Sequence, residues 1–443
     1  MPVSPARRAA FSILLAVEKR SAYASELLSA EGEEKLSHAD HRLATEIVMG
    51  VLRWRSVLDR QISTHSAHPL AKMDLEALIS LRMGAYQLQF LERVPSRAVI
   101  HESVELMKHA RKRSAAPFVN AVLRKLQPVP KPPADAIVKS QDGVELSDAS
   151  AHPIWLVERW IEQFGFERTR AICLHDQQIP ETTIRITDDS IARQLQYEGI
   201  ELKSGKLLAS ARHIKSGDIT RTKLFVEGRV AIQDEASQLV ALLVGQGQNI
   251  LDCCAAPGGK TRILAERNPQ AKVLALELHP HRARVLRKMA PQKNVRVVTG
   301  DATKFSAGER FDRILADVPC SGTGTLARNP EIKWRLTPQD LADLQARQSA
   351  ILLAAMEQLA PGGKLIYSTC SLEREENSAI VEKALSAKSA FKLLDCGDEL
   401  RMLQQQGELM WADIPSLLQG PYLRTIPGVH PGDGFFAAVL TRT

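Results

Sequence analysis

Short apolar runs alternate with helical stretches from residue 236 to the end of the chain, and this regularity restricts the fold more than any other feature. The expected strands are NILDCC (249–254), VLALE (273–277), VRVVT (295–299), DRILADV (312–318), KLIYSTC (364–370) and FFAAVL (435–440). Between them lie helical patterns such as HRARVLRKMA (281–290) and AILLAAMEQLA (350–360). Strands that alternate with helices form a mostly parallel, doubly wound sheet. We therefore expect an α/β, Rossmann-like domain over residues 236–443.

The first part of the chain, residues 1–126, has a helical period instead. Apolar residues recur at helical spacing in AFSILLAVEK (10–19), HRLATEIVMGVLRW (41–54) and LEALISLRMGAYQLQFL (75–91), which predicts an all-helical domain. Basic residues gather near its end: Lys108, Arg111, Lys112, Arg113, Arg124 and Lys125. Two interpretations stay open, a solvated basic face or an RNA-binding bundle, because cations near phosphates supply most nonspecific affinity for nucleic acid.

A linker and a smaller module are expected between these two domains. QPVPKPPAD (127–135) has four prolines in nine positions, which predicts a stiff, extended linker, and we assign residues 127–149 to it. Residues 150–235 mix helix and strand signals. HPIWLVERWIEQFG (152–165) has a helical pattern, whereas TTIRIT (182–187) and KLFVEGRVAI (223–232) alternate as strands. This mixture predicts a small α+β module.

Composition and charge exclude several classes of protein. No apolar run approaches the ~20 residues that span a bilayer, and Glu18, Lys19 and Arg20 soon interrupt the apolar N-terminal stretch. We therefore expect a cytoplasmic protein without a membrane partner. The six cysteines include no CxxC pair and no zinc-ligand spacing, which predicts reduced thiols and no metal site. The net charge of +7 favours an acidic partner such as nucleic acid.

A turn rich in small residues follows the first strand of the expected sheet. Its residues are Cys254, Ala255, Ala256, Pro257, Gly258, Gly259, Lys260 and Thr261. Small residues let a ligand approach the backbone, and the helix that follows offers free N–H groups. A phosphate-binding P-loop would need glycine where Cys254 stands, and the GxGxxG fingerprint is absent as well. The turn therefore predicts a ligand that lacks a triphosphate or a pyrophosphate.

Two acidic residues follow the next two strands at matching positions. Glu277 ends the second strand, where a carboxylate can hold the two hydroxyls of a ribose. Asp301 follows the third strand and could accept a hydrogen bond from an adenine amine. A nucleoside-bearing ligand without pyrophosphate fits this set, and S-adenosyl-L-methionine is such a ligand.

Two cysteines lie where the fourth and fifth strands end, in Asp317-Val318-Pro319-Cys320 and in Thr369-Cys370-Ser371. If the strand order is 3-2-1-4-5, these strands are neighbours and both thiols emerge side by side at the ligand-binding edge. A thiolate that adds to carbon 6 of cytosine makes carbon 5 nucleophilic enough to accept a methyl group. Asp317 is placed to act as the acid at N3, and a second thiol could assist the final elimination. Spacing alone does not say which thiol attacks.

Three motifs carry a family resemblance: CCAAPGGKT (253–261), DVPCSGTGTLARNPEIKW (317–334) and STCSLEREEN (368–377). They resemble the motifs of the RNA cytosine-5 methyltransferases of the RsmB/NOP family. The resemblance implies that Cys370 is the nucleophile and that Cys320 helps to release the product. It also implies that the turn Cys254–Lys260, Glu277, Asp301 and Asp317 contact S-adenosyl-L-methionine.

The resemblance extends over nearly the whole chain. Residues 1–126 resemble the NusB-type RNA-binding domain, and HPIWLVERW (152–160) and GRVAIQDEASQL (228–239) resemble the family's middle module. Within the family, this combination is similar to bacterial small-subunit (16S) rRNA methyltransferases, which implies an RNA partner, most readily 16S rRNA, and no DNA. A monomer is the default expectation. The alternatives are a tRNA cytosine-5 methyltransferase and a noncatalytic RNA-binding assembly factor, although the intact turn, Asp317 and both cysteines argue against the latter.

Overall fold

The chain forms two compact units in the computed structural model, which describes residues 3–20, 22–32, 36–126 and 134–443. The helical unit comprises Met1–Ile179 and Leu326–Arg335, and the sheet unit comprises Pro180–Thr325 and Leu336–Thr443. The chain thus leaves the sheet unit for a short segment and then returns to it. No helix among the described residues combines the length and apolarity that a membrane crossing requires.

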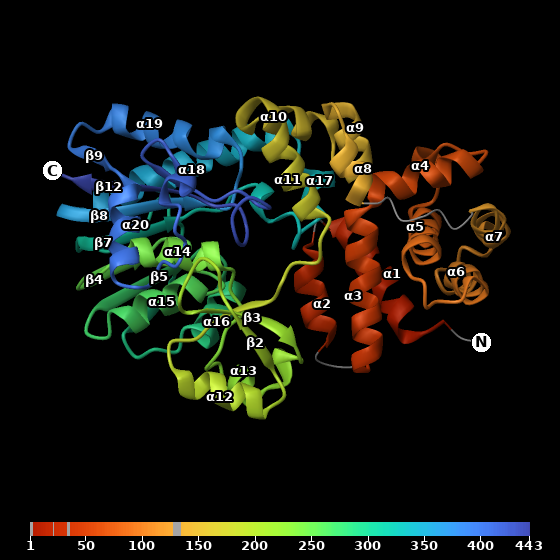
Figure 1. The fold of residues 1–443 in the computed structure, drawn as a ribbon, viewed down its shortest axis with the longest axis horizontal. Helices are drawn as coiled ribbons and strands as arrows, with labels where there is room; N and C mark the ends of the chain where they lie inside the picture. Colours follow the sequence, from red (N-terminus) through yellow and green to blue (C-terminus); the bar gives the residue numbers. More distant parts are fainter. Residues whose placement is uncertain (1–2, 21, 33–35, 127–133) are drawn as a thin grey trace. The chain divides into compact units, whose positions relative to one another are not determined.

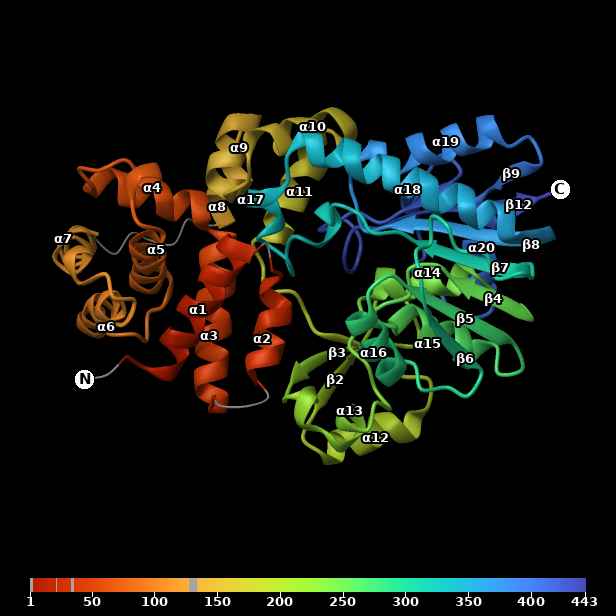
Figure 2. The ribbon, with the colours of Figure 1, turned by 180° about the vertical axis from the view of Figure 1, so that it is seen from behind.

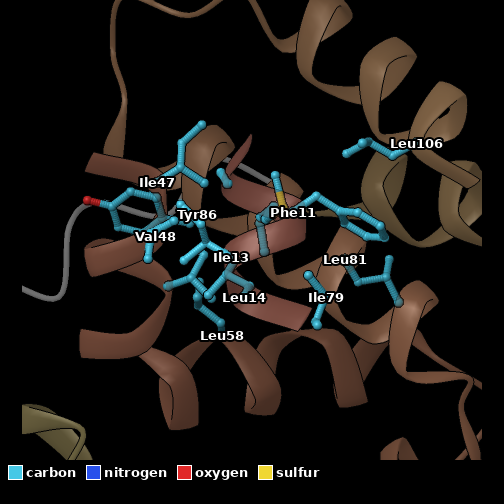
Figure 3. Close-up of a cluster of buried hydrophobic side chains, with 14 of the residues drawn as sticks. Phe11, Ile13, Leu14, Ile47, Val48, Leu58, Ile79, Leu81, Tyr86 and Leu106 are labelled. Atoms are coloured by element: carbon cyan, nitrogen blue, oxygen red, sulfur yellow. The ribbon is translucent and has the colours of Figure 1, made fainter. Parts of the chain in front are cut away.

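The helical unit consists of helices (Figure 1), and in the described part of residues 1–126 they agree with the all-helical domain that the sequence predicts. They are α1 (Pro5–Arg20), α2 (Ala24–Gly32), α3 (His38–Arg53), α4 (Arg55–His65), α5 (Leu75–Phe90), α6 (Ser96–His109), α7 (Ala116–Lys125), α8 (Ala134–Lys139), α9 (Gly143–Ser150), α10 (Ile154–Phe164), α11 (Phe166–Asp176) and α17 (Ile332–Arg335). Helices α1 to α7 share one apolar core, in which Leu14 of α1, Ile47 of α3 and Leu58 of α4 are fully buried (Figure 3). Each such side chain stabilises the fold by about 1.5–3 kcal/mol.

The segment expected as a linker, 127–149, contains helices where the structure describes it. Residues 127–133 lie outside the described residues, and α8 and α9 occupy most of the remainder. The side chain of Asp142 caps α9 by accepting a hydrogen bond from the backbone N–H of Glu145. Helices α10 and α11 pack against α8 and α9 and bury Trp160, so contacts place them with the helical unit. Contacts thus group residues 150–179 with the helical unit and residues 180–235 with the sheet unit, and a separate module over 150–235 stays a prediction.

A small antiparallel sheet begins the sheet unit. Its strands β1 (Thr183–Arg185), β2 (Glu201–Ser204) and β3 (Ala211–Ser216) have the order β1-β3-β2 and pack with helix α12 (Asp189–Tyr197). The strand prediction for TTIRIT is confirmed, but that for KLFVEGRVAI is wrong, because Lys223–Val226 is the short helix α13. The hydroxyl of Thr222 caps this helix by accepting from the N–H of Phe225, and Gly228, with φ +69°, follows it. Strands β2 and β3 were not expected.

The large sheet has the predicted parallel core (Figure 2). Its strands are β4 (Asn249–Asp252), β5 (Lys272–Glu277), β6 (Val295–Thr299), β7 (Phe311–Asp317), β8 (Leu359–Thr369), β9 (Phe391–Leu394), β10 (Leu418–Gln419), β11 (Tyr422–Arg424) and β12 (Phe436–Arg442). The order β6-β5-β4-β7-β8 is the expected 3-2-1-4-5, and these neighbours are parallel. Strand β12 extends the sheet antiparallel to β8.

Helices cover both faces of this sheet. They are α14 (Glu235–Leu243), α15 (Gly259–Arg267), α16 (Pro280–Met289), α18 (Pro338–Gln358), α19 (Ser378–Ala387) and α20 (Cys396–Gln405). Side chains of α14, α15 and α20 share one apolar cluster with the sheet, and those of α18 and α19 share another. Successive residues of β7 lie on opposite faces of the sheet and so belong to different clusters: Leu315 belongs to the first and Ile314 to the second. The doubly wound fold leaves the strand ends free to carry the site.

Candidate active site

The structure brings Cys320 and Cys370 together at the carboxyl ends of two neighbouring strands. Strands β7 and β8 are parallel, with Asp317 paired to Ser368, so the chain leaves both strands at the same edge. The two sulfur atoms lie 3.2 Å apart, and both cysteines are half-buried and free of disulfides. A lone cysteine is usually a small buried apolar residue. Two thiols in contact at a ligand-binding edge form a candidate reactive pair.

The surroundings of Cys320 oppose ionisation of its thiol. The pKa of Cys320 is raised well above its usual value, first by its hydrogen bond to Cys370, then by burial and by the nearby carboxylates of Glu376 and Asp317. The geometry lets either sulfur donate to the other, and these surroundings favour the protonated form of Cys320.

Lys260 and Asp317 form an ion pair beside the thiols. The ammonium Nζ of Lys260 lies 2.8 Å from Oδ2 of Asp317, and the hydroxyl of Ser368 donates to Oδ1 at 2.7 Å. Burial lowers the pKa of Lys260, but Asp317 and Cys370 more than offset this and raise the pKa overall. Lys260 therefore stays charged. We call the set Cys320, Cys370, Lys260, Asp317 and Ser368 the thiol edge.

The glycine-rich turn lines a cavity at the start of α15. The lining residues are Ile232, Gln233, Ser237, Asp252, Cys254, Ala255, Ala256, Pro257, Gly258, Gly259, Lys260, Met289 and Asp317. Gly258 caps α15 with φ +121°, a backbone conformation that an L side chain rarely adopts. The first N–H groups of α15 have no partners inside the helix and can bind a ligand carboxylate there. The cavity also touches the thiol edge through Lys260 and Asp317.

Asp252 is a cavity residue that the sequence interpretation missed. It ends β4 directly before the turn, and its Oδ2 accepts a hydrogen bond of 2.7 Å from the hydroxyl of Thr261. Burial raises the pKa of Asp252 to about 7. An acidic residue at the end of the first strand was a usable signal in the sequence. This carboxyl anchors the turn to the sheet.

Glu277 and Asp301 lie at the ends of the next two strands. Glu277 is buried, and its Oε1 accepts from the N–H of His279 at 2.9 Å, whereas Oε2 has no hydrogen bond among the described residues. Asp301 accepts from the N–H of Thr303 and from its hydroxyl, and these bonds lower its pKa. Each carboxylate keeps an oxygen for a ligand, which fits the hydroxyls and the amine of an adenosyl group.

A second surface of interest lies on the helical unit, where α6 and α7 line a groove. Its residues are Arg97, Ile100, His101, Val104, Arg113, Ala116, Pro117, Asn120 and Arg124, and we call it the basic groove. Arg97 and Arg113 form no ion pair with any described residue, whereas Lys108 pairs with Glu105 and Lys112 with Asp74. The basic cluster of the sequence is thus partly neutralised, and its free charge faces the groove. Among the described residues, no group of three or more His, Cys, Asp or Glu side chains could hold a metal.

The fold and the site together define a methyltransferase of the doubly wound class, with a candidate nucleoside-binding turn and a candidate reactive thiol pair. Comparisons with known proteins identify the family. Residues 239–441 match the 16S rRNA methyltransferases RsmB/F, residues 4–128 match the NusB family, and residues 152–218 match the ferredoxin-like domain of RsmF/B-like methyltransferases.

Full-length relatives agree with these matches. The probable ribosomal RNA small subunit methyltransferase B of Bacillus subtilis strain 168 is 34% identical over 458 residues, covering 100% of both chains. The ribosomal RNA small subunit methyltransferase B of Vibrio cholerae is 30% identical, covering 93% of this chain and 91% of the relative. The crystal structure of PH0851 has the same fold, with a TM-score of 0.81 at 23% identity over the full length of both chains. The chain belongs to the RsmB/F family, and it is an RNA methyltransferase that uses S-adenosyl-L-methionine.

Proposed function

We propose that the protein methylates carbon 5 of a cytosine in small-subunit (16S) rRNA, with Cys370 as the nucleophile and Cys320 as the residue that aids release. The observation that carries this proposal is the contact of the two sulfur atoms, 3.2 Å apart, beside the Lys260–Asp317 ion pair. A methyltransferase that acts on a nucleophilic nitrogen or oxygen needs no thiol. Carbon 5 of cytosine does need one, because it is too weak a nucleophile by itself. The names of the relatives support small-subunit rRNA as the substrate.

The first half of the reaction uses Cys370, Asp317 and Lys260. The target base must leave its stack to reach the thiol edge. The thiolate of Cys370 then adds to carbon 6, N3 receives a proton from the Lys260–Asp317 pair, and carbon 5 gains enamine character. Glu277, Asp301 and the turn Cys254–Lys260 would hold S-adenosyl-L-methionine, which when bound would supply the methyl group to carbon 5 and leave as S-adenosyl-L-homocysteine. Lys260 thus serves the reacting base as well as the cofactor turn.

The second half removes the proton from carbon 5 and breaks the bond between Cys370 and carbon 6. The largest cause of the raised pKa of Cys320 is its hydrogen bond to Cys370. Once the sulfur of Cys370 is bonded to carbon 6, it carries no negative charge. It then no longer accepts the hydrogen bond of Cys320 as an anion would. Cys320 can then lose its proton to solvent water, and its thiolate accepts the carbon 5 proton. The electrons of the C5–H bond form the C5–C6 double bond, those of the S–C6 bond return to Cys370, and the proton on N3 returns to the Lys260–Asp317 pair. The same contact therefore keeps Cys320 protonated during attack and frees it for elimination.

The basic groove is our candidate for an RNA contact outside the active site. Arg97, Arg113 and Arg124 line it with His101, and two of these arginines lack ion-pair partners among the described residues. Lone arginines near a polyanion release counterions and contribute affinity without sequence specificity. We infer that the groove follows the phosphate backbone, while the thiol edge selects the base.

The substrate is tested by incubating the protein with radiolabelled S-adenosyl-L-methionine and either small-subunit rRNA or tRNA. We expect label in the small-subunit rRNA at the carbon 5 position of cytosine, located by bisulfite sequencing. Label in tRNA alone would replace the rRNA assignment with a tRNA methyltransferase. Label in neither RNA would favour an assembly factor.

The roles of the thiols are tested with Cys370→Ser and Cys320→Ser. We expect Cys370→Ser to abolish methylation and to form no covalent protein–RNA complex. Cys320→Ser should still attack but release poorly, so covalent complexes accumulate on denaturing gels. The reverse pattern would assign the attack to Cys320.

A further inference from the structure

Glu376 is a fully buried carboxylate directly behind the two thiols. It ends the short helix η5 (Arg374–Glu376) in the loop after β8, within the motif STCSLEREEN. It forms no salt bridge with any described residue, although an unpaired buried charge costs several kcal/mol unless hydrogen bonds satisfy it. Its hydrogen bonds therefore have to satisfy the buried charge, and they show which segments the carboxylate joins.

Both carboxylate oxygens of Glu376 bond to the residues that follow the cysteines. Oε1 accepts from the backbone N–H of Ser321 at 2.8 Å and from the side-chain amide of Gln348 at 2.8 Å. Oε2 accepts from the hydroxyl of Ser321 and from the hydroxyl of Ser371. Ser321 follows Cys320, and Ser371 follows Cys370. One carboxylate therefore bridges the two loops that carry the thiols.

Further bonds make this bridge rigid. The hydroxyl of Ser321 lies 3.1 Å from that of Ser371, and the amide of Gln348 also donates to the carbonyl of Pro319 at 2.9 Å. The backbone carbonyl of Glu376 accepts from the hydroxyl of Tyr367, which lies on β8. Glu376 is thus fixed to both cysteine loops and to strand β8. Its removal would leave buried donors on both loops without an acceptor.

We propose that Glu376 is the positioning residue that holds Cys320 in contact with Cys370, so that Cys320 stays within reach when release begins. The proposal rests on the proposed thiol mechanism. During that mechanism Cys370 becomes bonded to the base, and the contact between the sulfurs no longer keeps Cys320 in place. Glu376 still holds Ser321 through two bonds at that stage. The carboxylate touches neither cofactor-turn residues nor the thiols themselves, so its effect acts through Ser321 and Ser371.

The first experiment compares Glu376→Gln with the wild-type protein in the covalent-complex assay. Glutamine has the same shape, but its amide nitrogen cannot accept from the two serine hydroxyls. We expect the turnover rate to fall about 100-fold, because a displacement of about 1 Å of a reacting group has this effect. The fraction of protein trapped as RNA complex should rise, while the affinity for S-adenosyl-L-methionine changes less than about twofold. A slower rate with an unchanged trapped fraction would overturn the proposal.

Glu235→Gln is the matched control. Glu235 is equally buried in the same unit, and its carboxylate accepts from the N–H groups of Lys206, Leu207 and Leu208 and lies 2.8 Å from Nε2 of His213, away from the cysteine loops. It should lower the melting temperature without changing the trapped fraction. If Glu376→Gln fails to fold, Ser321→Ala takes its place, because it removes one hydroxyl and keeps the backbone N–H bond to Glu376.

A second measurement separates this proposal from the proposed function. Diamide accepts two electrons and two protons from a pair of adjacent thiols and leaves a disulfide. The wild-type thiols, 3.2 Å apart, should join quickly without any RNA, and Glu376→Gln should slow this step about tenfold. Equal rates in the two proteins would overturn the positioning role. Slow oxidation in Glu376→Gln together with no covalent RNA complex in Cys320→Ser would instead reject the proposed mechanism and keep the positioning role.

Discussion

The thiol edge of the sheet unit and the basic groove of the helical unit both carry charged side chains, but the two regions differ in whether those side chains have charged partners within the fold. At the thiol edge, Asp317 bonds to Lys260 and to Ser368, and each of these partners lies on a regular element. In the basic groove, Arg97 and Arg113 make no ion pair with any described residue. The charge at the edge is therefore held by partners within the fold, whereas these two arginines of the groove have no such ion-pair partner among the described residues.

This difference follows from the chemistry that each region is proposed to perform. Bond formation at a carbon needs the reacting groups held to a fraction of an ångström. Phosphates repeat along an RNA strand, so an arginine that moves finds another phosphate. We therefore expect single changes at the thiol edge to cost orders of magnitude in rate, and single changes in the groove to cost little. Each prediction below tests one side of this contrast.

The largest effect is expected for Lys260→Met. The substitution removes the ammonium that pairs with Asp317. The pair proposed to donate a proton to N3 of the cytosine then lacks its cation. We expect turnover to fall about 1000-fold, within the range for loss of an acid–base group. The measurement is single-turnover methylation together with binding of S-adenosyl-L-methionine by calorimetry. A loss confined to cofactor affinity would show that Lys260 belongs to the turn alone.

A pH-dependent effect is expected for Asp252→Asn. Burial raises the pKa of Asp252 to about 7 from 3.8, helped by Asp317 and opposed by the hydroxyl of Thr261. Between these two pH values the folded protein keeps a proton that the unfolded chain has lost. The wild type should therefore lose up to about 4 kcal/mol of unfolding free energy, relative to the variant, as the pH rises from 4 to 7. Urea unfolding of both proteins at pH 5 and pH 8 measures this, and a difference that is constant with pH would contradict it.

A smaller effect on stability is expected for Gly324→Ala. An added Cβ would lie 2.2 Å from the carbonyl oxygen of Gly434 and 2.8 Å from that of Cys370, and backbone atoms cannot move aside easily. We expect a loss of about 1–3 kcal/mol, with lower activity because the loop after Cys320 shifts. The control is Gly143→Ala in the helical unit, where the nearest atom to the added carbon would be the side-chain end of Ile161 at 3.2 Å, and the other neighbours, at 4.0 Å, are side chains as well. Equal unfolding midpoints for the two variants would show that the thiol loop tolerates displacement.

The sequence predicted the strand order and the meeting of the thiols, because both depend on a regular pattern. Parallel strands that alternate with helices place their carboxyl ends at one edge, so Cys320 and Cys370 had to emerge together once β7 and β8 were neighbours. The pairing of Lys260 with Asp317 was not predicted. The turn assigned Lys260 to the cofactor, and no periodicity shows in which direction a long side chain extends.

Buried charges were hidden from the sequence for a related reason. In the run EREEN, the three glutamates look alike, and such a run usually covers a solvated surface, but Glu373 and Glu376 are fully buried whereas Glu375 is half-buried. Lys333 is a similar case, since it lies in the helical unit and donates to the backbone carbonyls of Arg53 and Ala151 from far along the chain. Burial of a polar side chain depends on distant segments that supply its partners, and the local sequence does not contain them.

The smallest effects are expected in the basic groove, where Arg97→Ala, Arg113→Ala and Arg124→Ala should each weaken RNA binding only a few-fold. Each removes about one phosphate contact, so the triple variant should reduce the slope of log affinity against log salt by about 2–3. Turnover at saturating RNA should stay unchanged, because the groove takes no part in the chemistry.

Arg60→Ala is the control, since Arg60 is as exposed but already pairs with Asp148 at 2.6 Å. Filter binding over a range of salt concentrations gives the slopes, and an unchanged slope in the triple variant would move the RNA contact away from this groove. A fall in turnover instead would mean that the groove also orders the reacting base, and the contrast between the two regions would then be too simple.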